Sequence, residues 1–225
     1  MPTKNVVAGD VQLCKSAFDR LPKEKRERIL RAAVEEFADN GFEHTSIQQI
    51  AKKANISVGS VYKYFENKET LFTMVIQTGL FSLEDLLNNL SESDEDIFFK
   101  AEKIIKTIIQ FSKTQPEYIK LYNHITTSNN SKLIDMLSQR IEAISASIYT
   151  VAISKAQKTG DVRNDINPAM FAFLLDNLFM MLQFTTACDY YRERFLIYTG
   201  KDIYENEDVL VEEMLKFLKA AFNFK

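Results

Sequence analysis

The chain has 225 residues, enough for one or two domains, and its 46% hydrophobic content excludes a disordered protein. With only 6 Gly and 4 Pro, helices are favoured over a β-rich or loop-rich fold. The net charge of −3 excludes a wholly basic nucleic-acid protein, yet residues 1–75 hold 12 Lys and Arg against 10 Asp and Glu, and the remainder holds 16 against 21. We therefore expect any phosphate-binding surface in the N-terminal part.

The sequence favours a cytoplasmic protein without a membrane partner. Cys14 and Cys188 are far apart and lack metal-ligand spacing, as expected of reduced thiols in a cytoplasm. The N-terminus lacks the apolar core of a signal peptide. The most apolar stretch, 170–186, is interrupted by polar residues and falls short of the roughly 20 residues that a membrane span needs.

Nothing in the sequence singles out an active site. The two histidines, His44 and His124, and the two distant cysteines form no metal-binding pattern. The chain has no GxSxG, P-loop or GxGxxG motif. We predict no catalytic residue, no cofactor and no metal, so an enzyme is not expected.

The N-terminal residues predict an extension followed by a helix. Residues 1–21 show no sustained period and are expected to be mobile, although Phe18 and Leu21 could staple the start of the next helix. That helix begins at Pro22, a favourable first-turn residue. It ends at Gly41, which is free to adopt a left-handed cap.

Two shorter helices follow. One begins at Thr45 or Ser46, because a glutamine lies three residues after each and would complete a reciprocal capping box. The next is capped by Ser57 and carries its apolar period to Phe65.

The rest of the chain is predicted to be helical. Asn67 caps a helix over 68–90 that is long enough to join two domains, and an acidic segment at 91–96 ends it. Residues 190–203 are ambiguous. Further helices are expected over about 95–113, after Pro116, over about 132–158 ending at Gly160, from Asn167-Pro168 to about 188, and over about 206–223.

Two short helices joined by a tight turn, after a supporting helix, are typical of a helix-turn-helix, whose second helix fits the major groove. Gly59 in the first turn of that helix costs about 1 kcal/mol relative to Ala, which a close approach of DNA would explain. Lys68 opposes the dipole of the following helix, which a bound phosphate would explain. The exposed side of this helix would add hydroxyl and ammonium hydrogen-bond donors from Tyr62, Lys63 and Tyr64. Alternatively, the tyrosines are partly buried and Lys63 is a solvated charge.

The stretch from Ile29 to Leu71 closely resembles the DNA-binding domain of the tetracycline-repressor (TetR) family. Residues 160–175 weakly resemble the family's turn into its eighth helix. The residues that carry the N-terminal resemblance, in family order and spacing, are Ala33, Phe37, Gly41, Thr45, Ile50, Ala51, Ala54, Ser57, Gly59, Tyr62, Tyr64, Phe65, Lys68 and Leu71.

This resemblance implies an all-α fold of nine to ten helices and a homodimer. The expected organisation is a mobile extension over 1–21, a helix-turn-helix DNA-binding domain over 22–67, and a helical effector-binding and dimerisation domain over 68–225, in which 68–90 is the linking helix. The two recognition helices of a dimer would enter double-stranded operator DNA at major-groove segments roughly 34–36 Å apart.

The resemblance also assigns residues to DNA, where phosphate contacts fix register and base contacts specify sequence. Ser46 is also expected to bind DNA. Lys52 and Lys53 are expected to be either accessory phosphate contacts or a solvated pair. Thr45 and Ser57 would also cap helices. The phosphate-binding residues would be Thr45, Ser57, Tyr62, Tyr64 and Lys68. The residues facing base edges would be Val58, Gly59, Ser60 and Lys63.

The C-terminal part is rich in aromatic residues and methionine. Any single one is most simply a core residue, but the group fits an apolar pocket with few polar groups, which suits a lipophilic or aromatic effector. The expected pocket residues are Phe98, Phe111, Tyr118, Tyr122, His124, Phe173, Asn177, Met180, Met181 and Phe184.

Two C-terminal helices are expected to form a four-helix interface with their copies in a homodimer. Residues 169–186 are apolar around nearly the whole helix, and the last helix has a wide apolar stripe. Burial by the helix over 132–158 is the alternative. The expected interface residues are Phe171, Leu174, Leu178, Leu182, Leu210, Met214, Phe217 and Leu218.

The function expected from the sequence is that of a DNA-binding transcriptional regulator. A repressor that leaves its operator when a small effector binds is favoured. The alternatives are an activator, or a regulator that answers a protein partner.

Overall fold

The computed structural model describes residues 14–79 and 95–222. Within these ranges every regular element is a helix and none is a strand, which confirms the all-α fold class. The chain divides into two compact units, Met1–Gly79 and Leu80–Lys225. Most of the predicted extension (1–13) and part of the predicted linking helix (80–90) lie outside the described residues.

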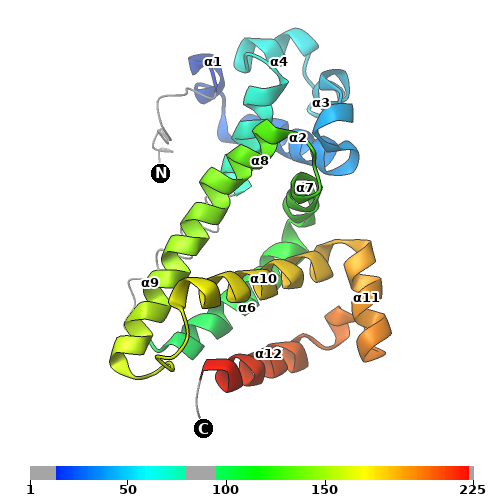
Figure 1. Ribbon diagram of the computed structural model, residues 1–225. Helices are drawn as coiled ribbons and strands as arrows, with labels where there is room; N and C mark the ends of the chain where they lie inside the picture. The colour runs from blue at the N-terminus through cyan, green and yellow to red at the C-terminus, as the bar shows by residue number, and fades with distance from the viewer. Residues whose placement is uncertain (1–13, 80–94, 223–225) are drawn as a thin grey trace. The chain divides into compact units, whose positions relative to one another are not determined.

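The first unit is built from short helices around α2 (Figure 1). The predicted caps Ser57 and Asn67 are confirmed, because their side chains accept hydrogen bonds from the backbone N–H groups of Ser60 (3.1 Å) and Thr70 (2.9 Å). The elements are α1 (Ser16–Asp19), α2 (Lys23–His44), α3 (Ile47–Lys53), α4 (Val58–Tyr64) and a further helix over 68–79.

The start of α3 decides between Thr45 and Ser46 as its cap. The Ser46 hydroxyl accepts the backbone N–H of Gln49 at 3.4 Å. Thr45 is buried, and its hydroxyl donates to the backbone oxygens of Gly41 (2.6 Å) and Glu36 (3.1 Å). The expectation that Thr45 caps α3 is therefore wrong.

Apolar side chains of α2, α3, α4 and the 68–79 helix meet in the core of the first unit. Phe37 packs edge-on against Phe72 with ring centroids 4.9 Å apart. Gly41 has a φ of 68° and bends α2 there, so that Phe42 in the last turn reaches Phe72 at 5.0 Å. Other fully buried residues of this core are Ile29, Ile50, Phe65 and Leu71.

The second unit begins and ends its helices largely where the sequence indicates. Asp96 caps α6, Asn167 caps α10, and Gly160 ends α9 with a left-handed φ of 84°. The elements are α6 (Ile97–Thr114), α7 (Pro116–Thr126), α8 (Ser131–Leu137), the π-helix η1 (Ser138–Glu142), α9 (Ala143–Thr159), α10 (Pro168–Ala187), α11 (Asp189–Thr199), the 3₁₀-helix η2 (Ile203–Glu205) and α12 (Glu207–Phe222).

The described residues contain more helices than the nine to ten expected. The helix predicted over 132–158 is divided into α8 and α9 by η1, where the backbone takes a wider turn. The ambiguous segment 190–203 forms most of α11. The short α1 precedes the helix predicted to come first.

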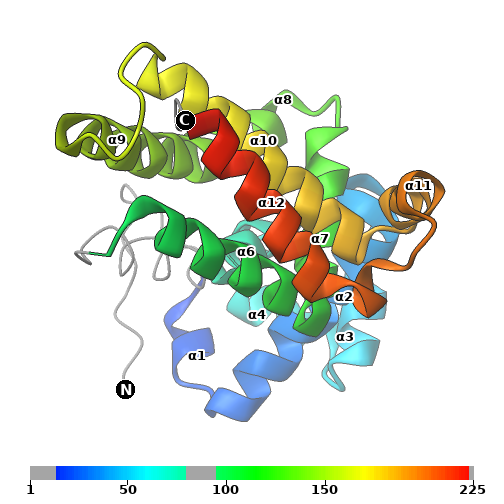
Figure 2. The same ribbon diagram turned by 90° about the horizontal axis from the view of Figure 1, so that it is seen from below.

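α10 is the central helix of the second unit, and it packs against α6, α7, α9 and α11 (Figure 2). By length and composition alone it could cross a membrane, a property that core helices of soluble proteins share. The helix extends beyond the apolar stretch 170–186 on which the sequence argument rested, so its 20 residues reach the length of a membrane span. Only 33% of its most apolar stretch is buried, so the described residues of the chain do not cover α10 on all sides.

Candidate nucleic-acid interface and effector site

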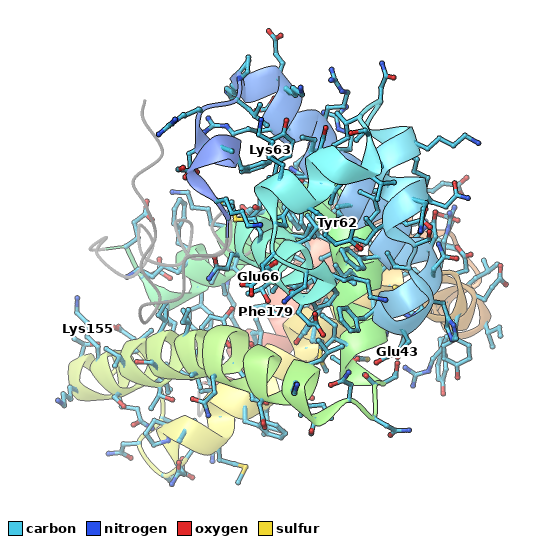
Figure 3. The ribbon with its side chains drawn as sticks, turned by 90° about the horizontal axis from the view of Figure 1, so that it is seen from above. Glu43, Tyr62, Lys63, Glu66, Lys155 and Phe179 are labelled. Atoms are coloured by element: carbon cyan, nitrogen blue, oxygen red, sulfur yellow. The ribbon has the colours of Figure 1, made fainter. Side chains whose placement is uncertain are left out.

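α4 turns a polar face away from the core of the first unit. Val61, 1% exposed, holds the opposite face on that core. Tyr62 is 48% exposed, and Lys63 lies beside it on α4 (Figure 3). The exposed or half-exposed residues of α4 and its cap are Ser57, Val58, Gly59, Ser60, Tyr62 and Lys63. These are predicted DNA-binding residues, so one continuous surface presents them.

The stretch of chain that forms this surface carries a net positive charge. Residues 45–65 contain three lysines and no acidic residue. Lys53 lies 3.0 Å from Glu36 and 3.7 Å from Asp39, and its hydrogen bond to Glu36 raises the pKa of Lys53. Lys53 therefore neutralises a buried carboxylate. The exposed Lys52 and Lys63 supply the surface charge of this stretch.

The fold gives no reason for a glycine at position 59. A methyl group added there would meet only the Ser57 hydroxyl, at 3.9 Å, which is ordinary van der Waals contact. Gly59 also lies within the regular α4 helix and has no positive φ. The lower helix propensity of glycine is thus uncompensated inside the unit, as expected if an outside molecule comes close to this residue.

Hydrogen bonds fix the turn between α3 and α4. Asn55 takes the left-handed conformation with φ 52°. The backbone N–H of Ile56 donates to the carbonyl oxygen of Ala51 at 3.0 Å, and the Arg28 guanidinium of α2 donates to that of Ala54 at 2.9 Å. The turn is therefore bonded both to α3 and to the supporting helix, which restrains the angle of α4.

Three residues expected to grip phosphates are engaged inside the protein, and one of them is the buried Thr45, whose hydroxyl donates to backbone oxygens of α2. Tyr64 is only 6% exposed, so the alternative of a buried aromatic applies to it. The half-buried Lys68 donates to the backbone oxygens of Glu43 (3.1 Å) and Thr45 (3.3 Å) and lies 4.7 Å from the ring centroid of Phe42. These contacts offset the unfavourable helix dipole without a bound phosphate.

Lys63 and Lys68 should respond differently to loss of charge. We expect Lys63→Met to reduce the salt dependence of DNA binding by about one counterion per recognition helix, because its ammonium is exposed. Lys68→Met should leave that slope unchanged and lower the free energy of unfolding by about 1 kcal/mol, because it loses two internal hydrogen bonds. Titrations at several salt concentrations and urea unfolding measure both effects. A reduced slope in Lys68→Met would instead return this residue to the DNA contacts.

The contact of α1 with α4 was missed by sequence reasoning. Phe18, expected to staple the next helix, is 1% exposed and packs against Phe65 with centroids 4.9 Å apart. One aromatic residue in an aperiodic segment gives no pattern from which such a contact can be predicted.

The predicted effector residues do not form one pocket in the second unit. His124 and Phe173 are exposed, and the Asn177 amide donates to the backbone oxygen of Phe173 at 2.7 Å. Phe98 packs near α12, against Phe222. The remaining residues form a cluster of side chains from α6, α7 and α10: Phe111, Tyr118, Tyr122, Met180, Met181 and Phe184.

An apolar cavity of about 50 Å³ lies among α6, α9, α10 and α12. Its lining includes Phe98, Ile153, Phe179 and Phe222, and only Phe98 was predicted. Drug-sized ligands occupy roughly 300–1,000 Å³, so the cavity would have to enlarge to hold one.

Four polar side chains, of which Tyr149 is buried and the others are half-buried, lie close to this cavity. The Tyr122 hydroxyl donates to Glu142 at 2.9 Å. Burial, together with the charge of Glu142, raises the pKa of Asp176 to about 6. Burial and the charge of Asp176 raise the pKa of Tyr149, whose ring lines the cavity. These side chains could orient a bound molecule.

The predicted dimer residues also divide by exposure. Leu182 (4%) and Leu218 (2%) lie in the core of the second unit, so their assignment to an interface is wrong. Leu174 (51%) and Phe217 (61%) are exposed. The remaining four, Phe171, Leu178, Leu210 and Met214, are half-buried against that core.

The chain is similar in sequence to known bacterial regulators. The family model for bacterial regulatory proteins of the tetR family matches residues 29–75. The HTH-type transcriptional regulator UidR of Escherichia coli K12 is 31% identical over 68% of this chain and 76% of its own length.

Solved structures share the fold over most of the chain. A TetR family transcriptional regulator from Chloroflexus aurantiacus J-10-FL has a TM-score of 0.70 at 21% identity, over 94% of this chain and 99% of that one. The transcriptional regulator FadR of Bacillus subtilis, solved with stearoyl-CoA, has a TM-score of 0.70 at 14% identity, over 88% and 99%. The chain thus belongs to the tetR family of bacterial regulatory proteins, and it is a transcriptional regulator with an N-terminal helix-turn-helix.

Proposed function

We propose that the exposed face of α4 reads an operator in the major groove and that the protein acts as a ligand-responsive repressor. Gly59 carries this proposal, because a glycine at this exposed position, in a stretch (45–65) without acidic residues, has no explanation inside the fold. Ser57, Val58, Gly59, Ser60, Tyr62 and Lys63 would contact DNA. Thr45, Tyr64 and Lys68 would hold the helices that present them.

The test is a mobility-shift experiment with a duplex selected from a random library by the wild-type protein. Affinity should fall steeply with salt, as phosphate contacts require. If no duplex binds in a salt-sensitive way, the DNA-reading role of α4 is excluded. A reporter gene behind the selected duplex then separates repression from activation.

The effector would bind inside the second unit and be lipophilic. The apolar cavity and the aromatic cluster around Phe184 support this class, and Asp176, Glu142 and Tyr122 would supply the polar contacts. FadR of Bacillus subtilis, a neighbour in fold, was solved in complex with stearoyl-CoA. The effector would act by binding one conformational state more tightly than the other.

Stearoyl-CoA, free stearate and an aromatic acid are suitable first probes. A probe that enters the second unit should raise its melting temperature, and a true effector should also release the selected duplex. A compound that stabilises the protein without changing duplex affinity is bound but is not an effector.

A second copy of the chain would cover the exposed face of α10. Met170 (61%), Phe173 (62%) and Leu174 (51%) lie at helical spacing on this face, and Phe217 adds an exposed apolar side chain on α12. A helix with large apolar residues left open on one face is typical of a subunit interface. We therefore assign Phe173 to the subunit interface and not to the effector pocket, where the sequence had predicted it.

Phe173→Glu should convert the dimer to a monomer at micromolar concentration, because a charge placed in an apolar interface must be desolvated without a partner. Light scattering measures the mass. Val151→Glu is the matched control, since Val151 is 65% exposed on α9, and it should leave the dimer intact. Equal masses for both variants and wild type would exclude this face as the interface.

A further inference from the structure

α4 is too short to be stable by itself. It has seven residues, whereas isolated helices shorter than about 12–15 residues are marginal in water. Its N-terminal end is held by the Ser57 cap and by the bonded turn before it. The C-terminal end leaves backbone carbonyls that need donors from elsewhere.

Lys15 supplies two of these donors. Its backbone N–H donates to the carbonyl oxygen of Tyr64 at 2.8 Å, and its side-chain ammonium donates to that of Tyr62 at 2.9 Å. A cation at a helix C-terminus also interacts favourably with the helix dipole. One residue outside the helix-turn-helix thus satisfies two carbonyls at the end of α4.

Phe18 fastens the same end by packing. Its ring is 1% exposed, with its centroid 4.9 Å from that of Phe65 and 6.1 Å from that of Tyr64. Phe65 follows α4 directly, and Tyr64 is its last residue. Phe18 therefore packs against the two residues at which α4 ends and the chain continues.

We propose that residues 14–19 are a clamp that positions α4 for DNA, with Lys15 and Phe18 as its positioning residues. The clamp lies before the segment matched by the family model, which begins at residue 29. It is a second restraint on the reading surface, independent of the turn between α3 and α4. This inference rests on the proposed role of α4 in DNA binding.

Positioning and direct contact predict different salt behaviour for Lys15. If Lys15 bonds to α4, Lys15→Met should weaken binding about threefold to tenfold with an unchanged salt slope. If it contacts a phosphate instead, the slope should fall by about one per recognition helix. Lys155→Met, an exposed lysine of the second unit, is the charge-matched control and should bind as wild type.

Phe18→Ala should weaken binding to the selected duplex by about tenfold or more, again at constant slope. Phe18→Leu should restore most of the affinity, because it refills the apolar site beneath Tyr64. Amide hydrogen exchange without DNA should show faster exchange in α4 for Phe18→Ala and Lys15→Met. Exchange in α6 and α10 should stay unchanged.

The clamp is excluded if both variants keep wild-type exchange in α4 and wild-type affinity. It is also excluded if the slope for Lys15→Met falls while exchange is unchanged. If Phe18→Ala unfolds the first unit, Lys15→Met still decides, because it removes one hydrogen bond and leaves the core intact. Failure of wild type to bind any duplex removes the DNA-reading role of α4, whereas the exchange data still report whether α4 is clamped.

Discussion

Replacing Gly59 with Ala is expected to make the protein more stable and its DNA binding weaker. The added methyl has open space, with its nearest neighbour the Ser57 hydroxyl at 3.9 Å. Alanine in a helix is favoured over glycine by about 0.5–1 kcal/mol, so the free energy of unfolding should rise by that amount. The same methyl would separate α4 from a closely approaching DNA surface. Affinity for the selected duplex should fall about tenfold to a hundredfold.

Opposite signs in the two measurements make this variant informative. A variant that only damages folding lowers both stability and affinity, and a neutral variant changes neither. Gln110→Ala on α6 is a suitable control, because it exchanges one exposed neutral residue for alanine in the other unit. Gly59→Ala with wild-type affinity would exclude a close approach at this residue.

The helix-turn-helix could be predicted because its signals are local. Ser57 and Asn67 each bond to a backbone N–H three residues later, so the short sequence contains the whole cap. Thr45 and Ser46 have equivalent local patterns and could not be separated. The Thr45 hydroxyl donates instead to two backbone carbonyls of α2, one of them nine residues earlier. No local sequence pattern predicts a bond over that distance.

Lys68 and Tyr64 show why the DNA-binding surface could be predicted only in part from the sequence. The resemblance placed both residues near DNA, and the helix dipole gave Lys68 a physical reason to bind phosphate. The carbonyls of Glu43 and Thr45 fulfil that need, because the bend at Gly41 brings the end of α2 to the ammonium. A pattern of residue types identifies an unsatisfied charge but not its partner.

The effector site was less predictable for a similar reason. Composition identified aromatic residues, but periodicity does not tell which face of α10 meets a cavity, a core or solvent. Phe173 and Phe179 illustrate this, since one is 62% exposed and the other 1%. The π-helix that places Glu142 opposite Tyr122 has no recognised sequence signal here.

The partly buried Asp176 of α10 is costly to ionise at neutral pH. Its neighbours are Glu142 of η1, Ser145 and Tyr149 of α9, and, through Glu142, Tyr122 of α7. Burial and Glu142 raise the pKa of Asp176 from 3.8 to about 6, although a hydrogen bond from Ser145 works in the opposite direction. The fold thus favours the protonated carboxyl.

The sign of the pH effect follows from this shift. Because the folded state holds the proton more tightly, the stability that Asp176 contributes is fully present below the unfolded pKa of 3.8 and is lost as pH rises through about 6. The full effect is about 3 kcal/mol. Asp176→Asn should therefore raise the free energy of unfolding by about 2–3 kcal/mol at pH 7.5, and by well under 1 kcal/mol near pH 4.

Urea unfolding at both pH values measures this difference, with Asp135→Asn as the control because Asp135 is exposed on α8. A gain of the same size at both pH values would contradict the raised pKa. A partly buried acid that destabilises the resting protein is a candidate for a functional role, since active and binding sites tolerate such groups. If Asp176 holds the effector, Asp176→Asn should keep its affinity for the duplex while losing release by the effector. If Asp176→Asn is more stable and still releases the duplex when the effector binds, Asp176 does not hold the effector.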